Sequence, residues 1–211
     1  MYAISVTTPE TRAEKKERTR RALLDGTLEL TKDSSFASVS LREIARSAGI
    51  VPTAFYRHFS SLEELALALV DEGMRALRLM LREARRSPGP ANAHASLEIL
   101  IRHVRANPEL FRFLYRERYG GPPEVRRAIR TEIGLIVRDL TIDLSRIMDL
   151  RDWPTEDLQM AADLIVTTMT QAMAEFLDAD DPRSEEDVAL RTERQMRLII
   201  LGMAGWRPKP D

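Results

Sequence analysis

The 211-residue sequence predicts an all-α fold of about nine helices. Two observations carry this prediction. Runs of β-branched residues that alternate with polar residues, which are typical of strands, do not occur. Glycine and proline instead cut the chain into pieces of helical length, as at Gly49, Asn107-Pro108, Gly120-Gly121 and Trp153-Pro154. Apolar residues recur at helical spacing between these breaks, so each piece has one face that can be buried.

The breaks and the apolar spacing together place the expected helices in order along the chain. We expect helices near residues 12–32, 41–48, 52–59, 61–86, 91–106, 108–119, 123–149, 155–177 and 184–204.

Composition excludes several classes of protein. Hydrophobic residues make up 44% and charged residues 31% of the chain, which is typical of a globular domain. The chain has no cysteine, which excludes a disulfide framework, thiolate metal ligands and a cysteine nucleophile. No apolar run is long enough to span a bilayer, and residues 1–10 lack the hydrophobic core of a signal peptide. We therefore expect a cytoplasmic protein with no membrane partner.

The charge is unevenly distributed along the chain. The net charge is −1, but residues 1–60 carry ten basic and seven acidic side chains, whereas the remaining residues carry 22 and 26. This asymmetry predicts a basic head on an acidic body.

Residues 33–60 carry the most specific local pattern. Ser40 and Glu43 fit a capping box that begins a short helix, and Gly49 fits the left-handed residue that ends it. Pro52 then suits the first turn of a second short helix. A second capping box, formed by Ser60 and Glu63, begins a third and longer helix. Two short helices joined by a glycine turn and packed on a longer one describe a helix-turn-helix.

The second short helix has an apolar side and a polar side. Phe55 and Phe59 are four residues apart and are expected to face inward. The outward side then presents small, hydrogen-bonding and cationic groups that suit base edges and phosphates: Thr53, Ala54, Tyr56, Arg57 and His58. This pattern favours DNA binding over the alternative, a short solvent-facing helix in an all-helical bundle.

The segment 41–59 resembles the DNA-binding segment of the TetR family of transcriptional regulators. An aliphatic-Ala-x-x-Ala-Gly stretch, residues 44–49, is followed by Tyr56-Arg57-His58-Phe59. Residues 15–75, and more weakly 105–135, also resemble the fatty-acid-biosynthesis repressor branch of that family, the FabR/DesT-like proteins. That branch responds to long-chain acyl thioesters.

The resemblance implies an operator-binding homodimer that binds double-stranded DNA, with no catalytic activity of its own. It places Arg42 at the DNA backbone, and Thr53, Tyr56 and His58 at bases or phosphates. Val51 departs from the Ser or Thr of many family members, so the recognition helix is expected to lack a side-chain cap. The division implied is a flexible tail at residues 1–11, a DNA-binding domain at 12–60, and a ligand-binding and dimerisation domain at 61–211.

The resemblance also implies an effector, which is a long-chain acyl-CoA or another acyl thioester. Candidate ligand-binding residues combine apolar groups with one cation: Phe111, Leu114, Arg118, Met169 and Met173. The residues alone favour an ordinary core and a solvated arginine face, so the acyl-thioester effector depends mainly on the resemblance. Two alternatives stay open: a repressor that responds to a drug-like or aromatic effector, and a helical acyl-carrier or scaffold protein that does not bind DNA.

The last two predicted helices, 155–177 and 184–204, each have a wide apolar face. The resemblance implies that they pair with their copies as a four-helix dimer interface, whereas the sequence alone also allows packing within one monomer.

The sequence lacks the patterns of common enzyme sites and cofactor sites. The three histidines, His58, His94 and His103, are too few and too dispersed for a zinc site. A Gly-rich phosphate loop and a Gly-x-Ser-x-Gly nucleophile elbow are both missing. The acidic residues Asp178, Asp180 and Asp181 do not have EF-hand spacing. We therefore expect no catalytic residue, no metal site and no cofactor other than the effector.

Overall fold

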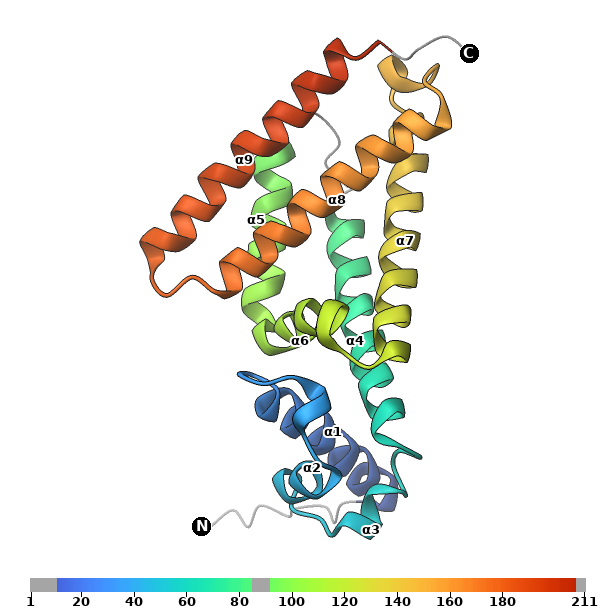
Figure 1. Cartoon of the computed structure of the whole chain (residues 1–211), viewed down its shortest axis with the longest axis vertical. Coiled ribbons are helices and arrows are strands. Elements are labelled where there is room, and N and C mark those ends of the chain that lie inside the picture. Colours follow the sequence, from blue (N-terminus) through green and yellow to red (C-terminus); the bar gives the residue numbers. More distant parts are fainter. Residues whose placement is uncertain (1–10, 85–91, 208–211) are drawn as a thin grey trace, which may run out of the picture.

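The computed structural model describes residues 11–84 and 92–207, and in these ranges it is all-helical. Of the predicted tail at residues 1–11, only Thr11 lies within the described residues. The described part contains nine α-helices and two 3-10 turns, η1 and η2 (Figure 1). In chain order the elements are α1 Arg12–Leu30, η1 Phe36–Ser38, α2 Leu41–Ser47, α3 Pro52–Phe55, α4 Leu62–Ala84, α5 Asn92–Ala106, α6 Pro108–Gly120, α7 Pro123–Ser145, η2 Met148–Leu150, α8 Thr155–Leu177 and α9 Pro182–Gly205.

The first three helices form a small head at one end of the molecule (Figure 1). Helix α1 packs on α2, and α2 packs on α3. The side chains between these helices are fully buried, with Leu23 from α1, Ile44 from α2 and Phe55 from α3 all at 0% exposure. The head therefore has an apolar centre, although each of α2 and α3 is too short to be stable alone.

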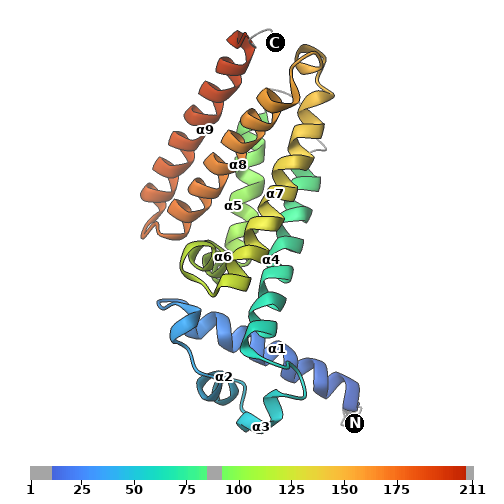
Figure 2. The ribbon, with the colours of Figure 1, turned by 45° about the vertical axis from the view of Figure 1, so that its right-hand side comes forward.

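The remaining helices form an elongated body. Helix α4 begins beside the head and runs on into the body, where it packs against α5 and α7 (Figure 2). Helix α8 lies between α7 and α9. The short α6 lies across the end of the body that faces the head, where it contacts α1 on one side and α7 and α8 on the other (Figure 1). Helix α6 is thus placed where the head and the body meet.

Several predicted boundaries change in the structure. The helix predicted at 123–149 ends at Ser145, and η2 follows as a separate turn. The helix predicted at 52–59 is α-helical only to Phe55, because the following amides bond three residues back, as when the His58 N–H donates to the Phe55 oxygen at 2.9 Å. The helix predicted at 61–86 is described from residue 62 to 84, and its predicted end lies outside the described residues.

The second predicted capping box is displaced by one residue. The Ser61 hydroxyl, rather than that of Ser60, accepts the Glu64 N–H at 3.1 Å. The Glu64 carboxylate accepts the Ser60 N–H at 2.5 Å, so Glu63 takes no part in the cap. The cause is a run of two serines and two glutamates, which offers the same spacing in two registers.

The apolar faces predicted on the two C-terminal helices pack within the monomer. Leu158 and Met173 of α8 and Val188 and Met196 of α9 are all buried. Both helices also carry large apolar side chains on their exposed sides: Met160 and Leu164 on α8, and Leu190, Leu198 and Leu201 on α9. The sequence left open whether these faces pack within one monomer or against a second copy. In the structure they pack within the monomer, and a different set of apolar residues faces outward.

None of the helices in the described ranges is both long enough and apolar enough to cross a membrane.

The turn after α2 allows a stability test of the head. Gly49 has φ of +68°, and a Cβ added there would meet nothing within 4 Å. The change Gly49→Ala therefore imposes only the cost of a left-handed backbone, and we expect it to lower the free energy of unfolding by about 1 kcal/mol in urea titration.

Gly134, an exposed residue inside α7, is the matched control. A Cβ at Gly134 also meets nothing within 4 Å, and the structure gives it no positive φ. Gly134→Ala should raise the free energy of unfolding by about 0.5–1 kcal/mol, because alanine favours a helix interior. Equal effects of the two changes would contradict the left-handed turn.

Candidate nucleic-acid interface

Helix α2 is held at both ends by local hydrogen bonds. At its start, the Glu43 N–H donates to the Ser40 hydroxyl at 3.3 Å, and the Ser40 N–H donates to the Glu43 carboxylate at 2.8 Å, which confirms the first capping box. The hydrogen bonds from Ser40 lower the pKa of Glu43. At its end, the Ile50 N–H donates to the Ala45 oxygen at 2.9 Å, and the Gly49 N–H donates to the Arg46 oxygen at 3.0 Å. This is the Schellman pattern, and it confirms the predicted turn at Gly49.

Helix α3 follows after two residues and is anchored by aromatic side chains. Val51 is extended and makes no side-chain cap, as predicted, and Pro52 occupies the first turn. Phe55 and Phe59 are buried, and their ring centroids lie 5.8 Å apart. Because these two rings fix one side of α3 against the head, the opposite side must face solvent.

The structure brings most of the predicted DNA-binding residues to this outward side. Tyr56 is 62% exposed, and its ring meets Phe55 edge-to-face at 5.6 Å. Thr53 and Arg57 are also exposed, whereas Ala54 and His58 are half-buried. Arg42 is exposed in the first turn of α2, whereas Thr53 and Ala54 lie on α3 and the other three follow its last residue. The arrangement presents a phenol, a guanidinium and small groups together, as major-groove readout requires.

Helix α1 adds positive charge beside α3. Burial lowers the pKa of His58, and the nearby charges of Lys16, Arg20 and Arg57 lower it further. Its Nδ1 atom is buried and has no hydrogen-bond partner among the described residues. The Arg20 guanidinium lies over the Phe59 ring, 4.5 Å from its centroid. Lys16 and Arg20 thus lie close to the recognition helix and are suited to phosphate contact.

Sequence reasoning missed Lys16 and Arg20. Their four-residue spacing places them on one side of α1, which is a visible signal, but the sequence does not show that this side of α1 adjoins α3. Only the packing of the head establishes that contact.

The five predicted ligand-binding residues lie in or near the apolar core of the body. Phe111 and Leu114 of α6 and Met173 of α8 are buried, and Met169 is half-buried against the same cluster. Arg118 is half-buried, and its guanidinium lies 5.3 Å from the centroid of the Tyr119 ring. The structure does not gather these five residues around one open cavity.

The body contains a closed apolar space between α5, α8 and α9. Of the five predicted residues, only Met173 lines it, and the space is too narrow to admit a water molecule. Its other lining residues are Leu97, Leu100, Ile101, Val104, Ala172, Phe176 and Val188. A ligand can enter only if α5 separates from α8 and α9.

The histidines of the body make structural contacts. His103 of α5 lies 3.2 Å from a Glu83 carboxylate oxygen of α4, as expected for a hydrogen-bonded histidine within a helical body. His94 lies 3.3 Å from Glu98 and 3.5 Å from Glu193. Within residues 11–84 and 92–207, no three His, Asp or Glu side chains gather in a way that would hold a metal ion.

Comparison with known proteins identifies two segments. Residues 23–69 match the family described as "Bacterial regulatory proteins, tetR family", and residues 91–202 match "Tetracyclin repressor-like, C-terminal domain". The first match contains the helix-turn-helix, and the second covers most of the body.

Solved structures share the fold at low identity. SCO4454, a TetR-family transcriptional regulator from Streptomyces coelicolor, is 21% identical, with a TM-score of 0.68 over 89% of this chain and 97% of its own. AibR, solved with isovaleryl coenzyme A and operator DNA, is 19% identical, with a TM-score of 0.64 over 83% and 96%. The fatty acid degradation regulator FadR from Bacillus halodurans is 15% identical, with a TM-score of 0.65 over 96% and 100%.

The match to the C-terminal domain alone spans more than half of the chain, and the match to the N-terminal domain contains the helix-turn-helix built above. The protein therefore belongs to the TetR family of DNA-binding transcriptional regulators, a family that is not enzymatic.

Proposed function

We propose that this TetR-family protein is a homodimeric repressor that controls fatty-acid metabolism and responds to a long-chain acyl thioester, such as long-chain acyl-CoA. The observation that carries the DNA-binding part is the exposed polar side of α3, held outward by the buried rings of Phe55 and Phe59. The effector is supported by the likeness of residues 15–75 and 105–135 to acyl-responsive repressors. Two proteins of the same fold are consistent with it: AibR, solved with isovaleryl coenzyme A and operator DNA, and FadR, a fatty acid degradation regulator.

Within the head, each exposed group has a proposed role at the operator. Thr53, Ala54 and Tyr56 lie on or beside the first turn of α3, where a recognition helix meets base edges. Arg57 and Arg42 carry permanent charge on the exposed surface and suit phosphates, as do Lys16 and Arg20. His58 is half-buried, and its ring nitrogens suit a hydrogen bond to the operator.

The proposed homodimer uses the exposed apolar sides of α8 and α9. Leu198 is 72% exposed, and Leu164, Leu190 and Leu201 are exposed with it. Large apolar side chains exposed on two neighbouring helices are typical of a protein interface. Pairing two copies through these helices gives a twofold axis, and two heads related by that axis match two half-sites.

The proposed effector acts on the body, residues 61–211, by shifting a conformational equilibrium. The apolar space between α5, α8 and α9 is closed, so an acyl chain binds only to a conformation in which these helices have separated. A ligand that prefers the open conformation shifts the population toward it by its differential affinity. Because α8 belongs to the proposed dimer face, opening the body changes the spacing of the two heads.

The role of Tyr56 in operator binding can be tested directly. We expect Tyr56→Ala to weaken binding to an operator selected from random DNA by about tenfold, the 1.4 kcal/mol of one lost contact. Tyr119→Ala is the control, since Tyr119 is 65% exposed on α6, outside the head. Fluorescence anisotropy measures both affinities, and an unchanged affinity for Tyr56→Ala would contradict the assignment of α3.

The dimer face can be tested by adding charge. We expect Leu198→Glu to convert the dimer to a monomer, because the interface would bury an unpaired carboxylate. Leu135→Glu is the control, since Leu135 is 48% exposed on α7. Size-exclusion chromatography with light scattering gives both masses. A wild type that is monomeric, or a dimeric Leu198 variant beside a dimeric control, would refute this interface.

Native mass spectrometry tests the effector. With added long-chain acyl-CoA, we expect a dimer that carries about one acyl-CoA per subunit, and free coenzyme A is the control that lacks the acyl chain. Binding of both compounds alike would mean that the acyl chain is not recognised. A dimer that stays empty, or that instead binds aromatic drug-like compounds, would favour the alternative class of effector.

A further inference from the structure

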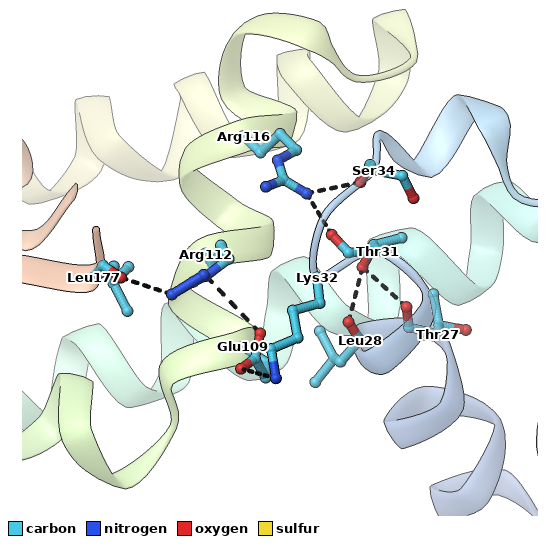
Figure 3. Close-up of polar contacts among 9 residues, drawn as sticks. All are labelled: Thr27, Leu28, Thr31, Lys32, Ser34, Glu109, Arg112, Arg116 and Leu177. Carbon is cyan, nitrogen blue, oxygen red and sulfur yellow. Dashed lines mark hydrogen bonds and ion pairs between the residues drawn. The ribbon is translucent and has the colours of Figure 1, made fainter. Parts of the chain in front are cut away.

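The junction between head and body is built around one turn of α6. The loop that follows α1 passes beside α6, and the close-up of Figure 3 shows Arg116 directed into this loop and Arg112 directed away from it. The two arginines are four residues apart, so they lie on the same side of α6. The partners of Arg116 belong to the head, and the partner of Arg112 belongs to the body.

Arg116 binds the end of α1. Its Nη1 atom donates to the backbone oxygen of Thr31 at 2.5 Å and to that of Ser34 at 2.8 Å (Figure 3). Thr31 is the C-cap of α1, where backbone carbonyls lack helical partners and the helix dipole favours a cation. Hydrogen bonds from a charged guanidinium are about twice as strong as neutral ones. Arg116 therefore holds the head at a defined point.

Glu117 binds the next segment of the head. It is 0% exposed, and its Oε1 atom accepts the Phe36 N–H at 3.0 Å. The Phe36 ring is buried against Phe113 of α6, edge-to-face at 6.0 Å. Burial raises the pKa of Glu117, and its Oε2 atom has no hydrogen-bond partner among the described residues. A carboxylate buried in this way is costly for stability. We therefore assign Glu117 a different contribution: its hydrogen bond to the Phe36 N–H fixes the position of η1.

Arg112 connects α6 to the end of α8 in the body. Its Nη2 atom donates to the backbone oxygen of Leu177, the last residue of α8, at 2.6 Å (Figure 3). Glu109 lies 3.7 Å from Lys32 at the end of α1 and 3.9 Å from Arg112. One helix thus contacts the ends of both α8 and α1.

We propose that Arg116 and Glu117 are positioning residues for operator binding, which set the orientation of the head relative to α8 and α9 and hence the spacing between the two recognition helices of the dimer. This inference rests on the proposed homodimer. Without these contacts the head stays attached through α4, the shared apolar core and the Arg21–Glu72 pair at 2.6 Å, but its orientation is less defined.

The inference separates two properties of the operator. The base sequence of each half-site is read by side chains of α3, which Arg116 and Glu117 do not contact. The distance between half-sites is set by the separation of the heads. One inserted base pair moves the half-sites apart by about 3.4 Å and rotates them by roughly 35°, so a dimer with fixed heads must discriminate against it.

The experiment measures spacing discrimination rather than affinity alone. Operators are first selected from random DNA with wild-type protein. The dissociation constants are then measured for the selected operator and for versions with one base pair added or removed at its centre. The proteins are the wild type, Arg116→Gln, Glu117→Gln, and the control Arg127→Gln, which removes an exposed arginine paired with Glu124 in its own helix α7.

The measured quantity is the affinity for the selected operator divided by the affinity for an operator of altered spacing. We expect Arg116→Gln to reduce this ratio by about fivefold or more, since fivefold is the lower end of the coupling found between distant sites. Selection with this variant should return the same half-site sequence with a broader range of spacings. Glu117→Gln keeps the side-chain volume and an acceptor for the Phe36 N–H, so we expect a smaller loss in the same direction. The control should keep the wild-type ratio.

A variant that loses affinity equally for all spacings would overturn the inference, since that is the behaviour of a purely structural residue. If thermal melts show that Arg116→Gln does not fold, the ratio for Glu117→Gln decides. A wild type that selects single half-sites with no preferred spacing would overturn the proposed homodimer and the inference with it. A wild type with a preferred spacing that both folded variants retain would overturn the inference alone.

Discussion

Head and body are held together by one continuous apolar core. The cluster of buried residues that begins with Leu23, Ile44 and Phe55 in the head continues without a break to Phe111 of α6 and Val188 of α9. Burial of this apolar surface explains why the head stays against the body. The hydrophobic effect is not directional, so it does not by itself fix the orientation of the head. The rest of the structure depends on it: the outward side of α3 is outward only because the inward side is part of this core.

Polar contacts at the junction add what the apolar core lacks, which is direction. A buried ring such as Phe36 tolerates some sliding, whereas the guanidinium of Arg116 must meet two carbonyl oxygens of one loop. Glu117 costs stability by its burial, and it binds one specific N–H group. Buried polar groups often exchange stability for a defined geometry in this way. For a DNA-binding dimer, a defined geometry of the heads is what operator spacing requires.

The closed apolar space between α5, α8 and α9 limits how the proposed effector could act. Side chains fill the space between α5, α8 and α9, so the proposed effector could bind there only together with a change of shape. Helix α8 belongs to that closed space, to the exposed apolar surface and, through the Leu177 oxygen, to the contact with Arg112. In the proposed mechanism, a displacement of α8 would reach the head through Arg112 and Arg116 of α6.

The sequence by itself determined the helix-turn-helix, because the capping box of Ser40, the turn at Gly49 and the start at Pro52 act between residues a few positions apart. The same short segment also predicted the family of the protein and the side of α3 that faces solvent. The sequence did not show whether the apolar face of α8 packs within the monomer or against a second copy. Nor did it show that Lys16 adjoins His58, or that Glu117 binds Phe36 across 81 positions. Only the tertiary structure decided these contacts, because they depend on which helices pack together, and local periodicity contains no information on that choice.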